Sequence, residues 1–188
     1  MKRVLITGVH SYIGDSFGKF VSQWPDKYTV DKIDLRSKEW DQADFSKYDS
    51  IYHVTGIAHR KETAENAHEY FEVNRDLAVA VAKKAKAEGV KQFIFLSSGT
   101  IYGIETGVIT KETPINAKTN YGKSKAEAEE ELRTLNDESF HVAHSWRHLP
   151  PGSMRCHPGY YDCPDSGREC PTEASQISPD PPHHPPNG

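Results

Sequence analysis

The chain has 188 residues and a mass of 21.2 kDa, which suits one sizeable core and is too short for two comfortable domains. Its formal net charge of −4 excludes a strongly basic nucleic-acid binder and gives no attraction to an anionic membrane surface. No apolar run approaches the roughly 18 residues that a membrane span needs, and the apolar stretch at the N-terminus is too short for a secretory signal. We therefore expect a cytoplasmic protein without nucleic-acid or membrane partners.

The residue types divide the chain into two regions. Ten of the 12 prolines and all 3 cysteines follow residue 143, where Leu149, Met154 and Ile177 are the only large aliphatic residues. Such a segment buries too little apolar surface to offset the entropy of ordering it. We expect one ordered domain over residues 1–143 and a loose, Pro-rich tail over residues 144–188. The cysteines stand seven residues apart, without the closely spaced pairs of zinc sites, so no metal is expected.

Within residues 1–143 the hydrophobic pattern alternates between strands and helices. Apolar runs predict strands over residues 3–7, 28–35, 50–55, 92–97 and 140–143. Helical spacing predicts helices over residues 12–24, 65–88 and 120–135, with Gly89 capping the second of them. Strands separated by helices indicate an α/β fold, with a parallel sheet and helices on both faces. In such sheets ligands bind beyond the carboxyl ends of the strands.

Two groups of polar residues are interpreted as solvated. The glutamates of the last helix, at positions 127, 129, 130 and 131, are predicted to form an exposed face. His10, His53, His59 and His68 have no convergent spacing, so surface or loop positions are expected for them.

The first predicted strand leads into a helix through the turn Thr7-Gly8-Val9-His10-Ser11-Tyr12-Ile13-Gly14. A helix N-terminus carries unpaired N–H groups and partial positive charge, so it can bind a pyrophosphate. Gly8 would permit the tight turn and Gly14 close packing of helix on strand; an ordinary strand-to-helix turn is the alternative. Asp34, at the end of the second predicted strand, could accept both ribose hydroxyls and so favours NAD over NADP. Arg36 and Lys38 lie close enough in sequence to bind a 2′-phosphate instead.

The third candidate feature is a tyrosine–lysine pair. Tyr121 and Lys125 lie four positions apart near the start of a predicted helix, on one face, where an ammonium group would favour the phenolate. Tyr28 and Lys32 have the same spacing, but they lie on a predicted strand, where four residues span roughly 13 Å. Ser98, at the end of the strand over residues 92–97, could bond the substrate oxygen on which Tyr121 acts; a plain turn is the alternative.

Together these motifs resemble the extended short-chain dehydrogenase/reductase superfamily, and within it the NAD-dependent epimerase/dehydratases of the UDP-glucose 4-epimerase type. The resemblance rests on the turn ending at Gly14, on Asp34 and Asn74, on residues 97–103 and on residues 121–125, and it covers residues 1–143. It implies a Rossmann-type doubly wound sheet and a catalytic triad of Ser98, Tyr121 and Lys125. The cofactor-binding positions that it implies are Gly8, Ser11, Tyr12, Ile13, Gly14, Asp34, Asp44, Phe45, Val54, Thr55, Gly56, Tyr121 and Lys125.

The same resemblance implies oxidation of a nucleotide-sugar hydroxyl, with hydride passing to NAD and the proton to Tyr121. Family dehydratases carry an Asp-Glu pair where this chain has Gly99-Thr100, which favours a 4-epimerase or a simple NAD(P)-dependent reductase over a dehydratase. Relatives often form homodimers through their equivalents of the second and third helices.

Two departures from the family pattern affect these expectations. Ser11 replaces the middle glycine of the turn, which should weaken cofactor binding without abolishing it. The sequence after residue 143 does not resemble the C-terminal substrate domain of the family, so that domain is expected to be absent, through a premature end or an unrelated continuation. A dinucleotide-binding fragment or cofactor-sensing module without turnover is therefore the alternative function.

Overall fold

The computed structural model describes residues 1–58, 60–110, 112–144, 154–157 and 160–162. Its main sheet has five parallel strands in the order β2-β1-β3-β4-β6. They are β1 (Lys2–Thr7), β2 (Tyr28–Ile33), β3 (Ser50–His53), β4 (Gln92–Phe95) and β6 (His141–His144). All five match predicted strands, and the predicted parallel α/β class is confirmed.

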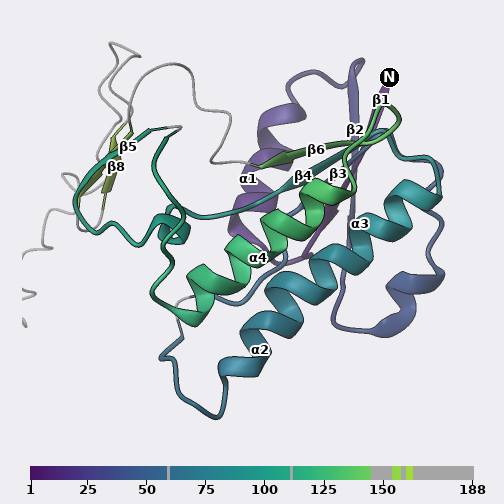
Figure 1. Ribbon diagram of the computed structural model, residues 1–188. Coiled ribbons are helices and arrows are strands. Elements are labelled where there is room, and N and C mark those ends of the chain that lie inside the picture. The colour runs from purple at the N-terminus through teal and green to yellow at the C-terminus, as the bar shows by residue number, and fades with distance from the viewer. Residues whose placement is uncertain (59, 111, 145–153, 158–159, 163–188) are drawn as a thin grey trace, which may run out of the picture.

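Helices cover both faces of this sheet (Figure 1). Helix α1 (Tyr12–Val21) lies on one face, where Phe17 packs edge-on against Tyr52 of β3. On the other face lie α2 (Ala67–Phe71), the π-helical turn η2 (Glu72–Asp76), α3 (Leu77–Ala87) and α4 (Asn120–Thr134). The helix predicted over residues 65–88 is thus one helical run with a π-turn inside it, and α1 is shorter than predicted.

The main core lies between the sheet and the pair α3 and α4. Leu5, Ile51, Phe93 and Phe95 point from the strands toward these helices and are fully or almost fully buried. Helix α3 presents mostly small side chains, which allow it to approach the sheet closely; its buried residues are Ala78, Val79, Val81, Ala82 and Ala85. Gly89 ends this helix in the left-handed region, as a capping glycine does.

Two residues that were expected to be exposed are buried instead. The prediction for His53 was wrong: it is fully buried, since its side chain points to the same face of β3 as Ile51 and lies against Phe93 and Phe95. The prediction for Glu129 was also wrong: it is 0% exposed, because the turn of α4 that carries it faces the sheet together with Ala128 and Leu132.

Five shorter elements complete the described chain. The short helices η1 (Lys38–Gln42) and η3 (Gly99–Tyr102) follow β2 and β4, and β5 (Gly107–Ile109) pairs antiparallel with β7 (Met154–His157), which pairs with β8 (Tyr160–Asp162). Strands β7 and β8 belong to the segment predicted as a loose tail, and the remainder of that segment after His144 lies outside the described residues, as does His59. No helix among the described residues is long and apolar enough to cross a bilayer.

Candidate functional site

The turn after β1 begins with a glycine that the backbone requires. Gly8 has a φ of 93°, a conformation that L side chains rarely adopt. Ser11 is the N-cap of α1, and its hydroxyl accepts a hydrogen bond of 3.2 Å from the backbone N–H of Gly14. A Cβ atom on Gly14 would lie 2.9 Å from Ile6 Cγ2, so only glycine lets α1 pack this closely on β1. Tyr12, in the first helical turn, is 82% exposed and leaves the helix N-terminus open to a ligand.

Asp34 lies beside this turn, because the backbone N–H of Gly8 donates to the Ile33 carbonyl at the end of β2. The Arg36 guanidinium donates to both Asp34 carboxylate oxygens, from Nε at 3.0 and 2.9 Å and from Nη2 at 2.6 Å. This contact lowers the pKa of Asp34 to about 2. Asp34 is therefore an anion at neutral pH, and Arg36 occupies the oxygens that a ribose would approach.

Two further residues that the resemblance implies for cofactor binding, Asp44 and Phe45, follow η1. The exposed carboxylate of Asp44 accepts hydrogen bonds from the backbone and hydroxyl of Ser46. Phe45 is fully buried, and Glu88 of the segment after α3 accepts a hydrogen bond from its N–H. Phe45 is thus a core residue whose N–H is already bonded, and the structure exposes none of its groups to a ligand.

The carboxyl ends of β1 and β3 are joined by a hydroxyl. Thr7 Oγ1 accepts hydrogen bonds from the backbone N–H groups of Val54 and Thr55, at 3.2 and 3.3 Å, and from the Thr55 hydroxyl at 3.0 Å. It also lies within hydrogen-bond distance of Nδ1 of His53, at 3.2 Å. Burial lowers the pKa of His53 to about 3, so this ring is neutral.

Asn74 connects the segment after β3 with α4. Its side chain makes two hydrogen bonds with the backbone of Ile57, accepting from the N–H at 2.7 Å and donating to the carbonyl at 3.0 Å. It also donates to the Ser124 hydroxyl at 3.2 Å. Asn74 lies in the π-turn, a local widening of a helix that often marks functional sites. A Cβ on Gly56 would lie 2.9 Å from Asn74 Oδ1 and 3.3 Å from Lys125 Nζ, so glycine is needed where this segment meets α4.

Lys125 is 4% exposed, which is unusual for a lysine. Its ammonium donates to the Leu96 carbonyl at 3.0 Å, just after β4, and lies 4.5 Å from the ring centre of Phe95. Burial lowers the pKa of Lys125 to about 8, while Glu129 acts in the opposite direction. The ammonium form therefore prevails at neutral pH, close to the point where it begins to lose its proton.

Tyr121 lies in the first turn of α4, one turn before Lys125. The start of this helix is held by Thr119, the N-cap, whose hydroxyl accepts from Gly122 N–H, and by Glu62. The carboxylate of Glu62 accepts hydrogen bonds from the backbone N–H groups of Asn120 and Tyr121, at 2.8 and 3.0 Å. Glu62 was not predicted from the sequence. A preference for an acidic group near a helix N-terminus is general, but nothing in the sequence indicates which of the acidic residues supplies it.

Ser98 and the tyrosine–lysine segment come together in space. Ser98 is the N-cap of η3, and its hydroxyl accepts from the backbone N–H and hydroxyl of Thr100, at 3.3 and 3.0 Å. A Cβ on Gly122 would lie 2.9 Å from the Thr100 carbonyl oxygen, so η3 packs directly on the first turn of α4. Ser98, Tyr121 and Lys125 thus lie around the carboxyl ends of β3 and β4, the region in which the sequence predicts a site.

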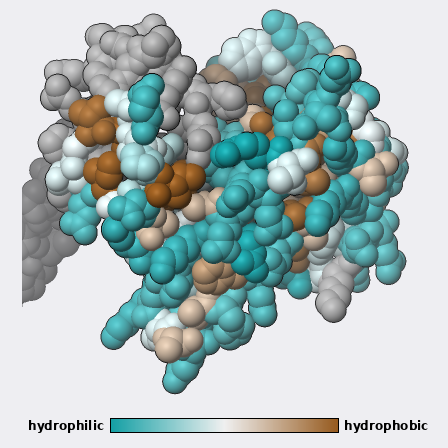
Figure 2. Space-filling model, in the orientation of Figure 1, coloured by the Kyte–Doolittle hydropathy of each residue, from teal (hydrophilic) through white to brown (hydrophobic). Residues whose placement is uncertain are grey.

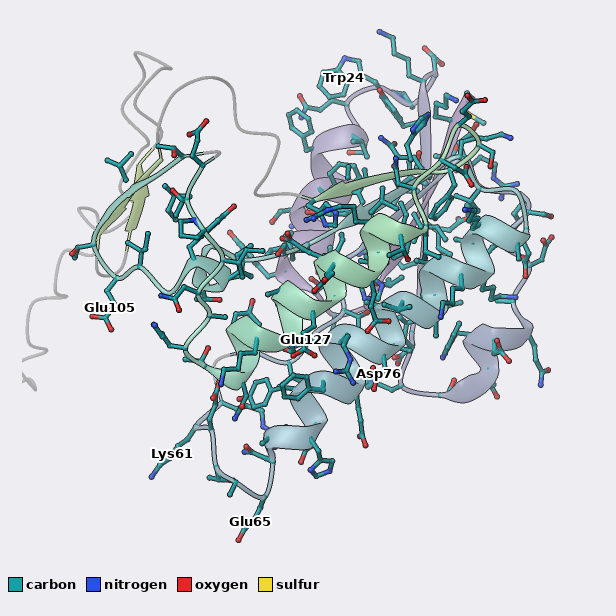
Figure 3. The ribbon with its side chains drawn as sticks, viewed as in Figure 1. Trp24, Lys61, Glu65, Asp76, Glu105 and Glu127 are labelled. Carbon is teal, nitrogen blue, oxygen red and sulfur yellow. The ribbon has the colours of Figure 1, made fainter. Side chains whose placement is uncertain are left out.

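Charged residues cover the outer side of the helices that carry these residues. Figure 2 shows a mainly hydrophilic surface over α2, α3 and α4. There Arg75 of η2 forms ion pairs with Asp76 and with Glu127 of α4, each at 2.6 Å, and a longer one with Glu131 at 3.7 Å. Asp76 and Glu127 lie side by side in Figure 3. These pairs tie α4 to the π-turn on the side away from the sheet.

The chain is similar to known proteins in sequence and in fold. The sequence pattern described as the NAD-dependent epimerase/dehydratase family matches residues 4–144. A UDP-glucose 4-epimerase of Cyamopsis tetragonoloba is 30% identical over 132 residues, which cover 69% of this chain and 36% of that protein. The human UDP-glucose 4-epimerase is 32% identical over 120 residues, covering 56% of this chain and 34% of that protein. The chain thus matches about a third of the length of these relatives.

Solved structures share the fold at lower identity. A UDP-glucuronic acid 4-epimerase from Bacillus cereus, in complex with UDP-glucuronic acid and NAD, matches with a TM-score of 0.66 and 17% identity, covering 76% of this chain and 55% of that one. The UDP-Glc/GlcNAc 4-epimerase from Campylobacter jejuni matches with a TM-score of 0.62 and 22% identity, covering 77% and 52%.

Proposed function

Because the chain belongs to the NAD-dependent epimerase/dehydratase family, we propose that its described domain binds NAD and carries the catalytic residues of a nucleotide-sugar 4-epimerase. The observation that carries the proposal is the meeting of Ser98, Tyr121 and the buried Lys125 at the carboxyl ends of β3 and β4. Relatives with this activity in their names match 69% and 56% of this chain.

The residues around the turn after β1 fit a dinucleotide. The N-terminus of α1 is open at Tyr12, and the anionic Asp34 lies beside it, where it can accept two ribose hydroxyls. Asp34 would repel a 2′-phosphate, which favours NAD over NADP, while Arg36 moderates that preference because it is bound to the same carboxylate. Ser11 uses its hydroxyl on Gly14 N–H, one of the groups that a pyrophosphate would contact, which supports weakened binding.

Each catalytic residue has a distinct task in this proposal. Bound NAD supplies the hydride acceptor for the sugar carbon that is oxidised. Tyr121 takes the hydroxyl proton, and the ammonium of Lys125 one turn away stabilises its phenolate. The Ser98 hydroxyl bonds the same sugar oxygen and orients it. The Thr100 hydroxyl stands where family dehydratases have an acidic residue, and it donates to Ser98 rather than supplying a carboxylate for elimination.

Calorimetric titration of the purified chain with NADH and with NADPH tests the cofactor proposal. We expect binding of NADH in the micromolar range and markedly weaker binding of NADPH. Asp34→Asn should reduce this discrimination, and Asp26→Asn, which changes an exposed aspartate before β2, serves as the matched control. Absence of binding by either nucleotide to a folded chain would contradict the proposal.

Binding without turnover is the second candidate function. It is favoured by the extent of the matches, since the chain covers only 52–55% of the solved epimerases it resembles. Addition of UDP-glucose or UDP-galactose to the chain with NAD, followed by proton NMR of the sugar, separates the candidates. Interconversion of the two sugars supports the epimerase, whereas NADH binding without conversion supports the binding module.

A further inference from the structure

Glu129 is a fully buried carboxylate with no role in the chemistry proposed above. Removing a carboxylate from water is costly unless a cation or hydrogen bonds compensate for it. Glu129 lies on the side of α4 that faces the sheet, with Ala128 and Leu132 as neighbours on the helix. The residue one turn earlier on this side is Lys125, which is also buried.

The other acidic residues of α4 have a different partner. Glu127 and Glu131 point to the outer side of the helix, where both form ion pairs with Arg75 of η2. Arg75 also contacts Asp76 and lies over the ring of Phe71. The helix therefore carries two sets of charges four residues apart: an outer set at positions 127 and 131 and an inner set at positions 125 and 129.

Two uncharged groups contact the Lys125 ammonium. They are the Leu96 carbonyl at 3.0 Å and the face of the Phe95 ring at 4.5 Å. Burial disfavours the ammonium and lowers the pKa of Lys125, and the negative charge of Glu129 opposes this effect. The carbonyl and the ring orient the ammonium and favour its charged form, and a carboxylate adds the attraction of a full negative charge.

Other titratable groups face the same region from the strands. His53 of β3 is neutral at physiological pH, since burial lowers its pKa to about 3, and it contributes no positive charge to pair with Glu129. His144 of β6 is buried, with its ring 6.2 Å from that of Phe95. A test must therefore distinguish whether the Glu129 carboxylate stabilises the ammonium of Lys125 or the ring of His144.

We propose that Glu129 is a positioning residue: its buried carboxylate keeps Lys125 in the ammonium form and keeps that ammonium directed at the Leu96 carbonyl, one turn from Tyr121. The inference rests on the proposed role of Lys125. Its test is made on the chain without cofactor, so a failure here leaves the NADH titration unaffected and the two failures can be told apart.

The first experiment follows the ionisation of Lys125 directly. The chain is labelled with ¹³Cε-lysine, the Lys125 signal is identified by its loss in Lys125→Met, and its chemical shift is followed from pH 6 to pH 11. Glu129→Gln should lower the titration midpoint of Lys125 by about one pH unit. An opposite charge one helical turn away raises the pKa of an ammonium by an amount of that order. Glu130→Gln, which removes an exposed carboxylate from the next position, should leave it unchanged. An unchanged midpoint in Glu129→Gln would overturn the proposal.

The second experiment is a double-mutant cycle that needs only urea unfolding. In the unmodified chain, Glu129→Gln should lower the unfolding midpoint, since it leaves a buried ammonium without its counter-charge. In a Lys125→Met background the same change should lower the midpoint by less, since the charge that it removes no longer faces the ammonium. If Glu129 instead stabilises another group, such as His144, Glu129→Gln lowers the midpoint equally in both backgrounds, and the proposal is wrong.

Discussion

At the scale of single residues, whether a tyrosine and a lysine four positions apart can lie close together depends on the element that carries them. Tyr121 and Lys125 are one turn apart on α4, whereas Tyr28 and Lys32 have the same spacing along the extended strand β2. Only the helical pair can act as a unit, because a strand separates residues at this spacing by roughly 13 Å.

This difference predicts the behaviour of two matched variants. Tyr121→Phe should leave NADH affinity within about twofold of the unmodified chain but reduce sugar conversion by about 10²-fold or more, because it removes the proton acceptor. Tyr28→Phe should change neither quantity. Calorimetry measures the affinity and NMR the conversion. Equal conversion by the Tyr121→Phe variant and the unmodified chain would remove Tyr121 from the mechanism.

His53 makes the stability of the chain sensitive to acid. Its pKa is about 3 in the folded chain and near 6.5 when unfolded, so the unfolded state binds the extra proton between these values. The folded state is therefore destabilised as pH falls below about 6.5. From pH 7 to pH 5 this one group should remove about 2 kcal/mol from the free energy of unfolding.

Urea unfolding at both pH values measures this loss. The His53→Gln variant keeps an amide that can bond Thr7. Between pH 7 and pH 5 its free energy of unfolding should fall by about 2 kcal/mol less than that of the unmodified chain. His141→Gln, at an exposed position on β6, should lose as much stability as the unmodified chain. An equal pH dependence in all three proteins would show that His53 does not titrate as described.

At the scale of elements, the approach of α1 to β1 depends on one of its two glycines. A Cβ on Gly14 would lie 2.9 Å from Ile6 Cγ2, whereas a Cβ on Gly18 has nothing within 4 Å. Gly14→Ala should therefore destabilise the fold and weaken NADH binding, since α1 must move away from the turn. Gly18→Ala should stabilise it by about 0.5–1 kcal/mol, the helix-propensity difference. Thermal unfolding with and without NADH distinguishes them, and equal effects would contradict this packing.

At the scale of the whole molecule, exposed apolar side chains predict self-association. On α1 and just beyond it, Phe20 and Trp24 are 57% and 38% exposed, and their rings are in edge-on contact; Figure 3 places Trp24 at the end of α1. Apolar residues also gather near β5 in Figure 2, where Val108 is partly exposed. The outer side of α2, α3 and α4 is mainly hydrophilic, in contrast to these two apolar regions.

Light scattering as a function of concentration measures this association. We expect the apparent mass to rise above that of a monomer, and Phe20→Gln should reduce the rise, because it removes the most exposed apolar group of this pair. Lys83→Gln, at an exposed position on α3, is the control. A monomeric mass at every concentration would contradict the prediction, and loss of association in the control alone would instead favour contact through α3.

The sequence predicted more of the fold than of the contacts within it. Every strand of the parallel sheet was predicted, because apolar runs and helical spacing are local patterns, and each is strong in residues 1–143. Segment ends were less accurate: α1 ends at Val21, before Trp24, and a π-turn interrupts the second helix at Asn74. Both depend on what the segment packs against.

Local pattern determined the parallel α/β class, the glycine turn after β1 and the placement of Tyr121 and Lys125 on one helix, since each depends on residues close in the chain. Tertiary structure alone decided that His53 and Glu129 are buried and that Glu62 holds the start of α4. Whether a polar side chain meets water or a partner depends on which distant segment packs over it. Glu62 and Tyr121, 59 positions apart, meet only because the chain folds β3 and α4 to the same edge of the sheet.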